Sequence, residues 1–469
     1  MAMQTTSSIH TTPALTPEAC QAARLARDSR FDGLFYTAVL STGIYCRPTC
    51  PARAPREDNV RYFASAAACA AEGYRPCLRC RPDAAPGYSP ANAQVTRAIA
   101  LLEQGLSLTD IAAELGITDR HLRNVFAESL GVGPKEYQIY RRCLLAKQLL
   151  HETPMPITDI ALACGFQSVR RFNDAFKRRL ALTPSEVRRS AQDRVTSHGI
   201  TLFLSYRPPY AWSSVQAFLA KRQVEGLERV TEASYSRSLS VPGGGWFDAV
   251  HEPSRHGFRV TFTLADPSRL SAAVAMVRRI LDLDANSLAI GRALRAAFKG
   301  SSSAPALTEG MRVPQFCSAF EAGVRAILGQ QVSVAAARKM TETLVHTLGE
   351  TRPLGEGGGH YHLFPAPAQV AADELLFLGM PASRRASLRA LAACCSEFPE
   401  LDVARWLAIK GIGPWTVSYA QMRGAQHTDI WLAGDLGIKH ALAQWPQISP
   451  DVAAPWRSYL TLQLWELLV

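Results

Sequence analysis

The hydrophobic pattern changes several times along the chain, and each change predicts a different kind of structure. From about residue 286 onward, apolar residues recur at three- and four-residue spacing, which is typical of amphipathic helices. Residues 201–205 and 259–264 are short apolar runs that predict strands of a small sheet. The Gly triplet at 243–245 indicates a hairpin or loop tip. The carboxy-terminal part is therefore expected to be an α/β cap followed by an all-helical bundle.

An internal repeat marks the middle of the chain. Residues 107–117 (SLTDIAAELGI) are echoed by residues 156–166 (PITDIALACGF). Each copy has a Thr at an expected helix cap and a Gly where a helix-turn-helix needs its turn: Thr109, Thr158, Gly116 and Gly165. The side chains of the second helices that we expect to reach DNA are Arg120, Arg123, Arg170 and Arg171. A charged solvated helix face is the alternative for any single Arg, but two copies favour DNA binding.

Charge and length narrow the class of protein. The chain has 469 residues and a net charge of +11, with a pI near 9.2, so we expect about three domains and an anionic partner, nucleic acid first. There is no apolar run of membrane length and no signal-peptide core. We therefore expect a cytoplasmic, nucleoid-associated protein of bacterial type that has no membrane partner. Eleven Cys in a reducing compartment point to metal binding or chemistry rather than disulfides.

Four of these cysteines have the spacing of a metal site. A C-x3-C pair and a C-x2-C pair are separated by 26 residues, and the four are Cys46, Cys50, Cys77 and Cys80. Four thiolates form a closed tetrahedral set for one Zn²⁺. Cys20 and Cys69 lack partners at ligand spacing and are interpreted as small buried hydrophobic residues. We expect no redox or nucleotide cofactor.

The residues around these cysteines suggest more than a structural zinc. Residues 41–50 (STGIYCRPTC) and 73–80 (GYRPCLRC) resemble the amino-terminal domain of the Ada-type methyl-phosphotriester repair proteins. The resemblance implies that Cys46 accepts a methyl group from a DNA phosphate. Arg53 and Arg75 are among the cations expected to hold the phosphate backbone. Methylation removes one negative charge from the zinc–thiolate group, so repair is expected to raise DNA affinity.

The repeat in the middle of the chain resembles the DNA-binding domain of AraC-type regulators over nearly its full length. That resemblance implies binding to promoter DNA, and transcriptional activation makes RNA polymerase an expected partner. Direct repair of O6-alkylguanine is not expected, because the chain has no Pro-Cys-His-Arg motif.

A Gly-rich turn organises the carboxy-terminal part. Gly-Ile-Gly at 411–413 is followed by Pro414, which suits the first position of a helix. Unpaired backbone N–H groups at such a turn suit a phosphate, although an ordinary αα-hairpin has the same pattern. This segment resembles the helix-hairpin-helix of DNA glycosylases. Residues 206–212 (YRPPYAW), 324–334 (VRAILGQQVSV) and 455–459 (PWRSY) fit the AlkA-type alkylbase glycosylases, so the resemblance covers about residues 197–469.

The glycosylase resemblance implies a set of site residues. Asp435 matches the catalytic Asp, and Asp402 and Asp429 are interpreted as cap or surface groups. The expected base pocket consists of Trp415, Tyr419, Trp465 and Phe218, for which core packing is the alternative. The expected DNA-binding residues are Gly411, Gly413, Thr416 and Gln331, of which Gln331 stands where the family can carry an apolar wedge. Glycosylases that also cut the strand use a Lys where this chain has Trp415, so we expect a monofunctional enzyme.

Taken together, the sequence predicts a multidomain α+β protein. Its expected parts are a disordered tail (1–15), a small zinc-bound α/β methyl-acceptor domain (16–86), an all-α tandem helix-turn-helix domain (87–190), a glycosylase α/β subdomain with an antiparallel-sheet cap (191–285) and a helix-hairpin-helix bundle (286–469). The expected function joins removal of 3-methyladenine, 3-methylguanine and 7-methylguanine from double-stranded DNA to methylation-dependent transcriptional activation. The alternative is a pure methylation-responsive transcription factor with a degenerate glycosylase domain.

Overall fold

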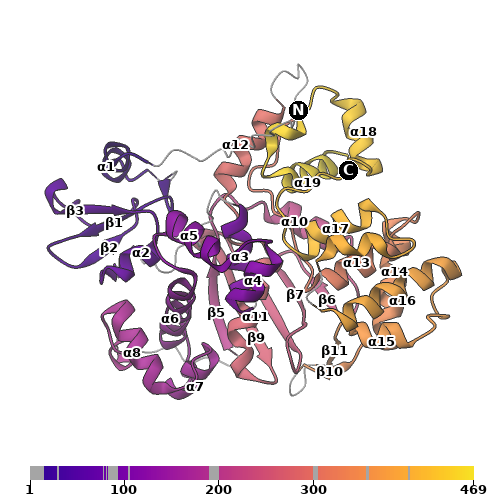
Figure 1. The fold of residues 1–469 in the computed structure, drawn as a ribbon, viewed down its shortest axis with the longest axis horizontal. Helices are drawn as coiled ribbons and strands as arrows, with labels where there is room; N and C mark the ends of the chain where they lie inside the picture. Colours follow the sequence, from indigo (N-terminus) through magenta and orange to yellow (C-terminus); the bar gives the residue numbers. More distant parts are fainter. Residues whose placement is uncertain are drawn as a thin grey trace. The chain divides into compact units, whose positions relative to one another are not determined.

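The computed structural model describes residues 15–28, 31–77, 79–80, 82, 93–103, 106–189, 200–298, 305–354, 359–399 and 402–468 (Figure 1). Two compact units are present, Met1–Leu144 with Asn173–Thr183 and Leu145–Phe172 with Pro184–Val469. The expected disordered tail lies outside the described residues apart from Leu15. Among the described residues, none of the helices combines the length and hydropathy that crossing a membrane requires.

The amino-terminal elements of the first unit form a small mixed sheet with short helices. They are α1 (Pro17–Leu25), β1 (Tyr36–Val39), β2 (Ile44–Cys46), β3 (Val60–Phe63), α2 (Ala66–Ala71) and β4 (Arg75–Pro76). The strand order is β3-β1-β2-β4, in which β1 pairs antiparallel with β2 and β3, and β2 pairs parallel with β4. In the parallel pair Tyr45 lies opposite Pro76, so Cys46 and Cys77 follow at the same end of the sheet.

The repeat forms two pairs of helices, as predicted. The helices of this part of the chain are α3 (Ala93–Glu103), α4 (Leu108–Glu114), α5 (Asp119–Leu130), α6 (Pro134–Glu152), α7 (Ile157–Ala163), α8 (Val169–Leu180) and α9 (Pro184–Arg189). Gly116 and Gly165 have φ of +64° and +77°, which a turn Gly adopts without strain. The predicted Thr caps are wrong. Ser107 caps α4 by accepting the Asp110 N–H at 3.2 Å, whereas α7 follows Pro156, which makes no side-chain cap.

The zinc-binding elements and the first helix pair share one hydrophobic core within the first unit. Ala67 and Ala70 of α2 pack in the same cluster as Phe126 and Leu130 of α5. The hydroxyls of Tyr45 on β2 and Tyr140 on α6 are 2.7 Å apart in the interior. These contacts fix the cysteine-bearing sheet to the first helix-turn-helix.

The second unit contains a five-stranded antiparallel sheet. Its elements are β5 (Ile200–Ser205), α10 (Trp212–Ala220), β6 (Glu228–Val230), β7 (Ser234–Leu239), β8 (Gly245–Glu252), β9 (Gly257–Leu264) and α11 (Leu270–Ile280). The strand order is β5-β9-β8-β7-β6. The two predicted strands are β5 and β9, which pair with each other. The predicted Gly tip joins β7 to β8, where Gly243 and Gly244 have φ of +83° and +75°.

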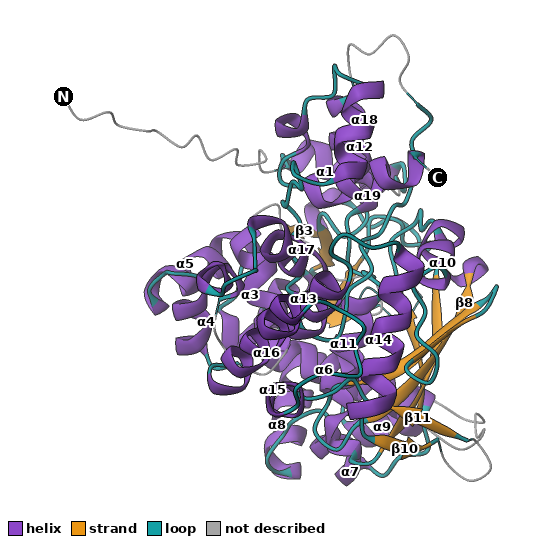
Figure 2. Ribbon diagram, turned by 90° about the vertical axis from the view of Figure 1, so that its right-hand side faces the viewer, coloured by secondary structure: helices purple, strands orange, loops and turns teal. Residues whose placement is uncertain are grey.

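Helices dominate the rest of the second unit, as the sequence predicts. The elements are α12 (Ser287–Ala297), α13 (Ala319–Leu328), α14 (Val334–Leu348), β10 (Thr351–Pro353), β11 (His360–His362), α15 (Pro367–Ala372), α16 (Ala382–Glu397), α17 (Pro414–Gly424), α18 (Leu436–Gln444) and α19 (Arg457–Leu467). Figure 1 shows α13 alongside α17. The short β10–β11 hairpin was not predicted. It lies beside the large sheet, where the rings of Tyr361 and Trp246 are 5.4 Å apart (Figure 2).

Candidate active site and zinc cluster

The Gly-rich turn forms the hairpin that the sequence predicts. A 3₁₀ helix, Val403–Ala408, precedes the turn. Gly411 has a φ of +87°, and Gly413 caps α17, whose first residue is Pro414. Ile412 is buried in the core of the bundle beside Trp406. Pro414 has no N–H, so the first N–H groups of α17 are those of Trp415 and Thr416, which have no acceptor within the helix.

Asp435 lies at the start of the next helix and is held by three hydrogen bonds. It is the N-cap of α18, and its Oδ1 accepts the Ile438 N–H at 3.2 Å. Trp465 Nε1 donates to Oδ1 at 2.9 Å, and Trp415 Nε1 donates to Oδ2 at 3.1 Å. An Asp that served only as a cap would not need two indole donors from two other helices. This arrangement therefore holds a carboxylate in a fixed orientation.

The carboxylate opens onto a cavity of about 360 Å³. Three of the four predicted pocket residues, Trp415, Tyr419 and Trp465, line it together with Asp435. Trp415 and Tyr419 are stacked, with centroids 5.2 Å apart and planes at 17°. The prediction for Phe218 is corrected. Its ring lies behind the lining residues, with the Arg222 guanidinium 3.8 Å from the ring centroid.

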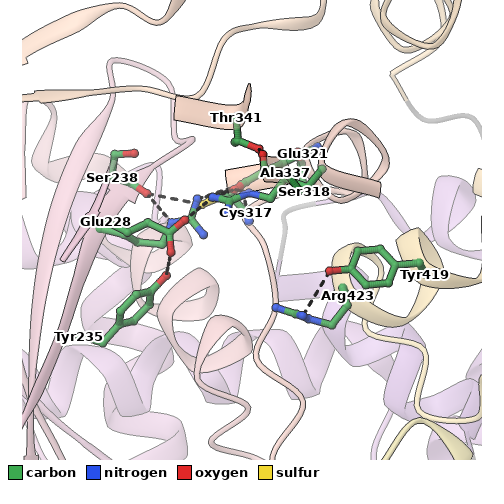
Figure 3. Close-up of polar contacts among 12 residues, drawn as sticks. Glu228, Tyr235, Ser238, Cys317, Ser318, Glu321, Ala337, Thr341, Tyr419 and Arg423 are labelled. Carbon is green, nitrogen blue, oxygen red and sulfur yellow. Dashed lines mark hydrogen bonds and ion pairs between the residues drawn. The ribbon is translucent and has the colours of Figure 1, made fainter. Parts of the chain in front are cut away.

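Cations next to the cavity were missed at the sequence level. Arg222 and Arg325 both line it, and burial lowers the pKa of Arg222 to about 10. The guanidinium of Arg423 lies 4.5 Å from the centroid of Phe316, another lining residue, and also faces Tyr419 (Figure 3). Arg222, Arg325 and Arg423 come from three distant segments of the chain, so no single sequence motif contains all of them.

A buried ion-pair network supports the wall that Arg325 forms. Arg237 on β7 donates to both oxygens of Glu321 on α13, at 2.8 and 2.9 Å. Arg325 pairs with Glu321 and with Glu228. Tyr235 donates to Glu228 at 3.1 Å, a contact that Figure 3 marks with a dashed line. Two buried cations thus face two buried carboxylates, which meets the need of such charges for partners. The network joins the sheet to α13 and fixes the position of Arg325.

Two predicted DNA contacts differ in their accessibility. Gln331 is exposed in the turn between α13 and α14 and has a φ of +57°, in the left-handed region. Thr416 is only 2% exposed, and its hydroxyl accepts a hydrogen bond from Gln330 Nε2 at 3.2 Å. The Thr416 side chain is therefore not available to DNA. Its backbone N–H lies in the first turn of α17.

The four predicted cysteine ligands come together at one end of the small sheet. The sulfur atoms of Cys46, Cys50, Cys77 and Cys80 all lie within 4.8 Å of one another. The Sγ atoms of Cys50 and Cys77 are 4.0 Å apart, near the separation of about 3.8 Å that tetrahedral Zn–S bonds of 2.3 Å imply. The donor set and its geometry therefore fit one zinc ion.

The pKa values of the clustered thiols also favour a bound cation. Hydrogen bonding to Cys80 raises the pKa of the Cys46 thiol, and the same contact lowers the pKa of Cys80 to about 6. Burial raises the pKa of Cys50 to about 11. Crowded sulfurs cannot all ionise unless a cation offsets their repulsion, and a Zn²⁺ ion bound by the four cysteines would supply that charge.

The predicted basic DNA contacts are accessible to different degrees. Arg120 and Arg123 are exposed on α5, and Arg170 and Arg171 are exposed on α8. In the zinc-binding part, Arg53 is exposed, whereas Arg75 is half-buried. The backbone N–H of Arg75 donates to the Gly43 carbonyl oxygen at 2.8 Å. The side chains on α5 and α8 lie on the second helices of the two repeats, where groove contacts are expected.

Comparison with known proteins places these sites in a family. Residues 19–83 match the metal binding domain of Ada, residues 111–190 a helix-turn-helix domain, and residues 201–318 the AlkA N-terminal domain. The "Probable bifunctional transcriptional activator/DNA repair enzyme AlkA" of Mycobacterium tuberculosis is 36% identical over 481 residues, which cover 96% of this chain and 96% of that protein. The chain belongs to this family.

Two Escherichia coli proteins match separate parts of this family member. DNA-3-methyladenine glycosylase 2 is 33% identical over 56% of the chain and 95% of its own length. The bifunctional transcriptional activator/DNA repair enzyme Ada is 32% identical over 38% of the chain and 50% of its own length. The predicted fusion of an Ada-type zinc-binding domain, a helix-turn-helix DNA-binding domain and an AlkA-type glycosylase is thereby confirmed.

Proposed function

We propose that the carboxy-terminal part is a monofunctional DNA glycosylase that releases alkylated bases of the 3-methyladenine, 3-methylguanine and 7-methylguanine class. The observation that carries this proposal is the Asp435 carboxylate in the wall of an aromatic cavity. A flipped alkylpurine is cationic, and the faces of Trp415 and Tyr419 attract a cationic ring. The carboxylate stabilises the positive charge that develops on the sugar as the base leaves. No Lys stands at the hairpin position of Trp415 to form a Schiff base.

The test is release of bases from methylated double-stranded DNA. Each released base leaves an abasic site, which hot alkali converts into a strand break. The wild-type chain should produce alkali-dependent breaks and free methylpurines, and few breaks without alkali. The alternative function, a methylation-responsive transcription factor with an inactive glycosylase domain, predicts DNA binding without any released base.

The hairpin is proposed to hold a DNA phosphate through backbone N–H groups, so changes there should weaken DNA binding without altering base choice. The two glycines differ as tests. A Cβ at Gly413 meets nothing within 4 Å, and the backbone there is not left-handed. We expect Gly413→Ala to keep its thermal stability and to bind DNA a few-fold more weakly, measured by fluorescence anisotropy.

Gly411→Ala serves as the contrasting variant. Its Cβ would lie 2.1 Å from Ser387 Oγ, and its φ of +87° strains any L side chain. We expect this variant to lose about 1–2 kcal/mol or more of stability as well as DNA affinity. Unchanged affinity together with an altered preference among methylpurines in Gly413→Ala would exclude the phosphate role.

We further propose that Cys46 accepts a methyl group from a methyl phosphotriester in DNA. A zinc ion held by Cys46, Cys50, Cys77 and Cys80 would supply the charge that keeps the sulfurs deprotonated. The Cys46 sulfur attacks the methyl carbon, an S–C bond forms, the C–O bond breaks, and the phosphodiester leaves as an anion. Arg53 and Arg75 are the proposed contacts to the backbone of that DNA. The product is a thioether, which has lost one negative charge, so DNA affinity should rise.

Peptide mapping after incubation with DNA that carries methyl phosphotriesters tests the acceptor. We expect one added methyl group, on the peptide with Cys46, and tighter promoter binding after the transfer. Cys46→Ala should show neither change. A methyl group on Cys50, Cys77 or Cys80, or promoter affinity that methylation does not alter, would reject this mechanism.

We propose promoter binding by the exposed Arg side chains of α5 and α8, with RNA polymerase as the partner in activation.

Gln331 is proposed to fill the gap left by a flipped base. Its exposed position and positive φ support that role, and its amide adds hydrogen-bonding capacity that an apolar wedge lacks. We propose the domain limits predicted from the sequence, which are 1–15, 16–86, 87–190, 191–285 and 286–469.

A further inference from the structure

Trp465 makes a contact that base stacking does not require. Its Nε1–H donates to Asp435 Oδ1 at 2.9 Å, while Trp415 Nε1–H donates to Oδ2 at 3.1 Å. Together with the Ile438 N–H, three donors reach a carboxylate that has about four acceptor directions. One direction, at Oδ2, is left for water or the sugar. The two indoles come from α17 and α19, so the carboxylate is held between two helices.

Gly437 makes this approach of Trp465 sterically possible. A Cβ at position 437 would lie 3.1 Å from Trp465 Cδ1, 3.3 Å from its Nε1 and 3.0 Å from Asp435 Oδ1. Each of these separations is shorter than ordinary van der Waals contact, and the indole is attached to a well-packed helix. A Cβ at position 437 therefore requires the indole of Trp465 or the carboxylate of Asp435 to shift by a few tenths of an ångström. Gly437, in the first turn of α18, therefore contributes to the support of Asp435.

We propose that Trp465 is a positioning residue for Asp435 and that Gly437 makes this contact possible. In this arrangement, Trp465 and Asp435 act on the sugar rather than on the departing base. The proposal rests on the proposed glycosylase function. Hydrogen bonds at both oxygens offset the loss of hydration in an aromatic cavity and fix the direction of the negative charge. Trp415 differs from Trp465 because its ring also stacks on Tyr419, and so it serves base and carboxylate together.

The decisive variant is Trp465→Phe, which keeps an aromatic face and removes the N–H. Single-turnover release of 3-methyladenine and of 7-methylguanine should fall about 10- to 100-fold, the range expected when a reacting group is misplaced slightly. KM should change little, and the fold loss should be the same for both bases, because the sugar is common to them. Trp415→Phe should give unequal losses for the two bases.

Gly437→Ala should reproduce the base-independent loss. Gly434→Ala is the matched control, because a Cβ there meets nothing within 4 Å in the same segment. Binding to DNA that contains an abasic-site analogue and thermal unfolding show whether each variant is folded. A loss that depends on the base, a raised KM, or wild-type rates in Trp465→Phe would overturn the positioning role. If the wild-type chain itself releases no base, the proposed glycosylase function fails instead.

Discussion

Replacing Asp435 by Asn is expected to lower base release by about 100-fold or more while leaving binding to undamaged DNA nearly unchanged. Asn is as good a helix N-cap as Asp, so α18 should still begin at residue 436. The negative charge that faces the developing positive charge is lost. In addition, an amide has one NH₂ group in place of an oxygen, so either Trp415 or Trp465 loses its acceptor. The effect should fall on the rate of the chemical step rather than on KM.

The chain offers a matched control for this variant. Asp402 is also an N-cap Asp, which accepts the Ala404 N–H at 3.0 Å, but it is exposed and does not line the cavity. Asp402→Asn should release bases at the wild-type rate. Single-turnover assays on one methylated duplex compare the two variants directly. Near-normal release by Asp435→Asn would remove Asp435 from the catalytic role, and a similar loss in both variants would indicate a folding effect.

Local patterns with fixed spacing were predictable from the sequence. The cysteines at 46, 50, 77 and 80 meet because a thiolate pair three or four residues apart reaches one ion, and the parallel pairing of β2 with β4 brings both pairs to one end of the sheet. The hairpin at 411–413 was recognisable because a left-handed turn there needs Gly. Local patterns also predicted the two helix pairs, from the sequence repeat, and the strands β5 and β9, from short apolar runs.

Features that depend on distant contacts were not predictable. The network of Arg237, Glu321, Arg325 and Glu228 joins residues up to 97 positions apart, and no local pattern relates them. Phe218 was misplaced because residue type alone does not show which aromatic faces the cavity. The caps of α4 and α7 were missed because both helices begin earlier than predicted, at Leu108 and Ile157, so that Thr109 and Thr158 lie inside their first turns.

Replacing Cys77 by Ala is expected to abolish zinc binding and to unfold the amino-terminal domain. Cys77 is only 7% exposed and directly follows β4, where its N–H donates to Tyr45 O at 3.0 Å. The core around this sheet is small, with the buried residues Tyr36, Ala38, Tyr45 and Cys69. Structural zinc sites contribute an apparent free energy of roughly 10–16 kcal/mol, which is comparable to the whole stability of a typical domain. Cys46→Ala should cause a smaller loss of zinc binding and of stability than Cys77→Ala, because water can take the place of one half-exposed ligand.

Zinc quantification on the intact protein, combined with hydrogen exchange of β1–β4, measures both parts of this expectation. Cys69→Ala is the control, because Cys69 is fully buried in the same core but lies outside the four-sulfur cluster. It should retain one zinc and lose stability only through a small cavity, on the order of 1–2 kcal/mol. The order of damage should therefore be Cys77→Ala, then Cys46→Ala, with zinc binding unaffected in Cys69→Ala. Full zinc content and slow exchange in Cys77→Ala would show that the sheet folds without the metal, and the cluster would then have only its chemical role.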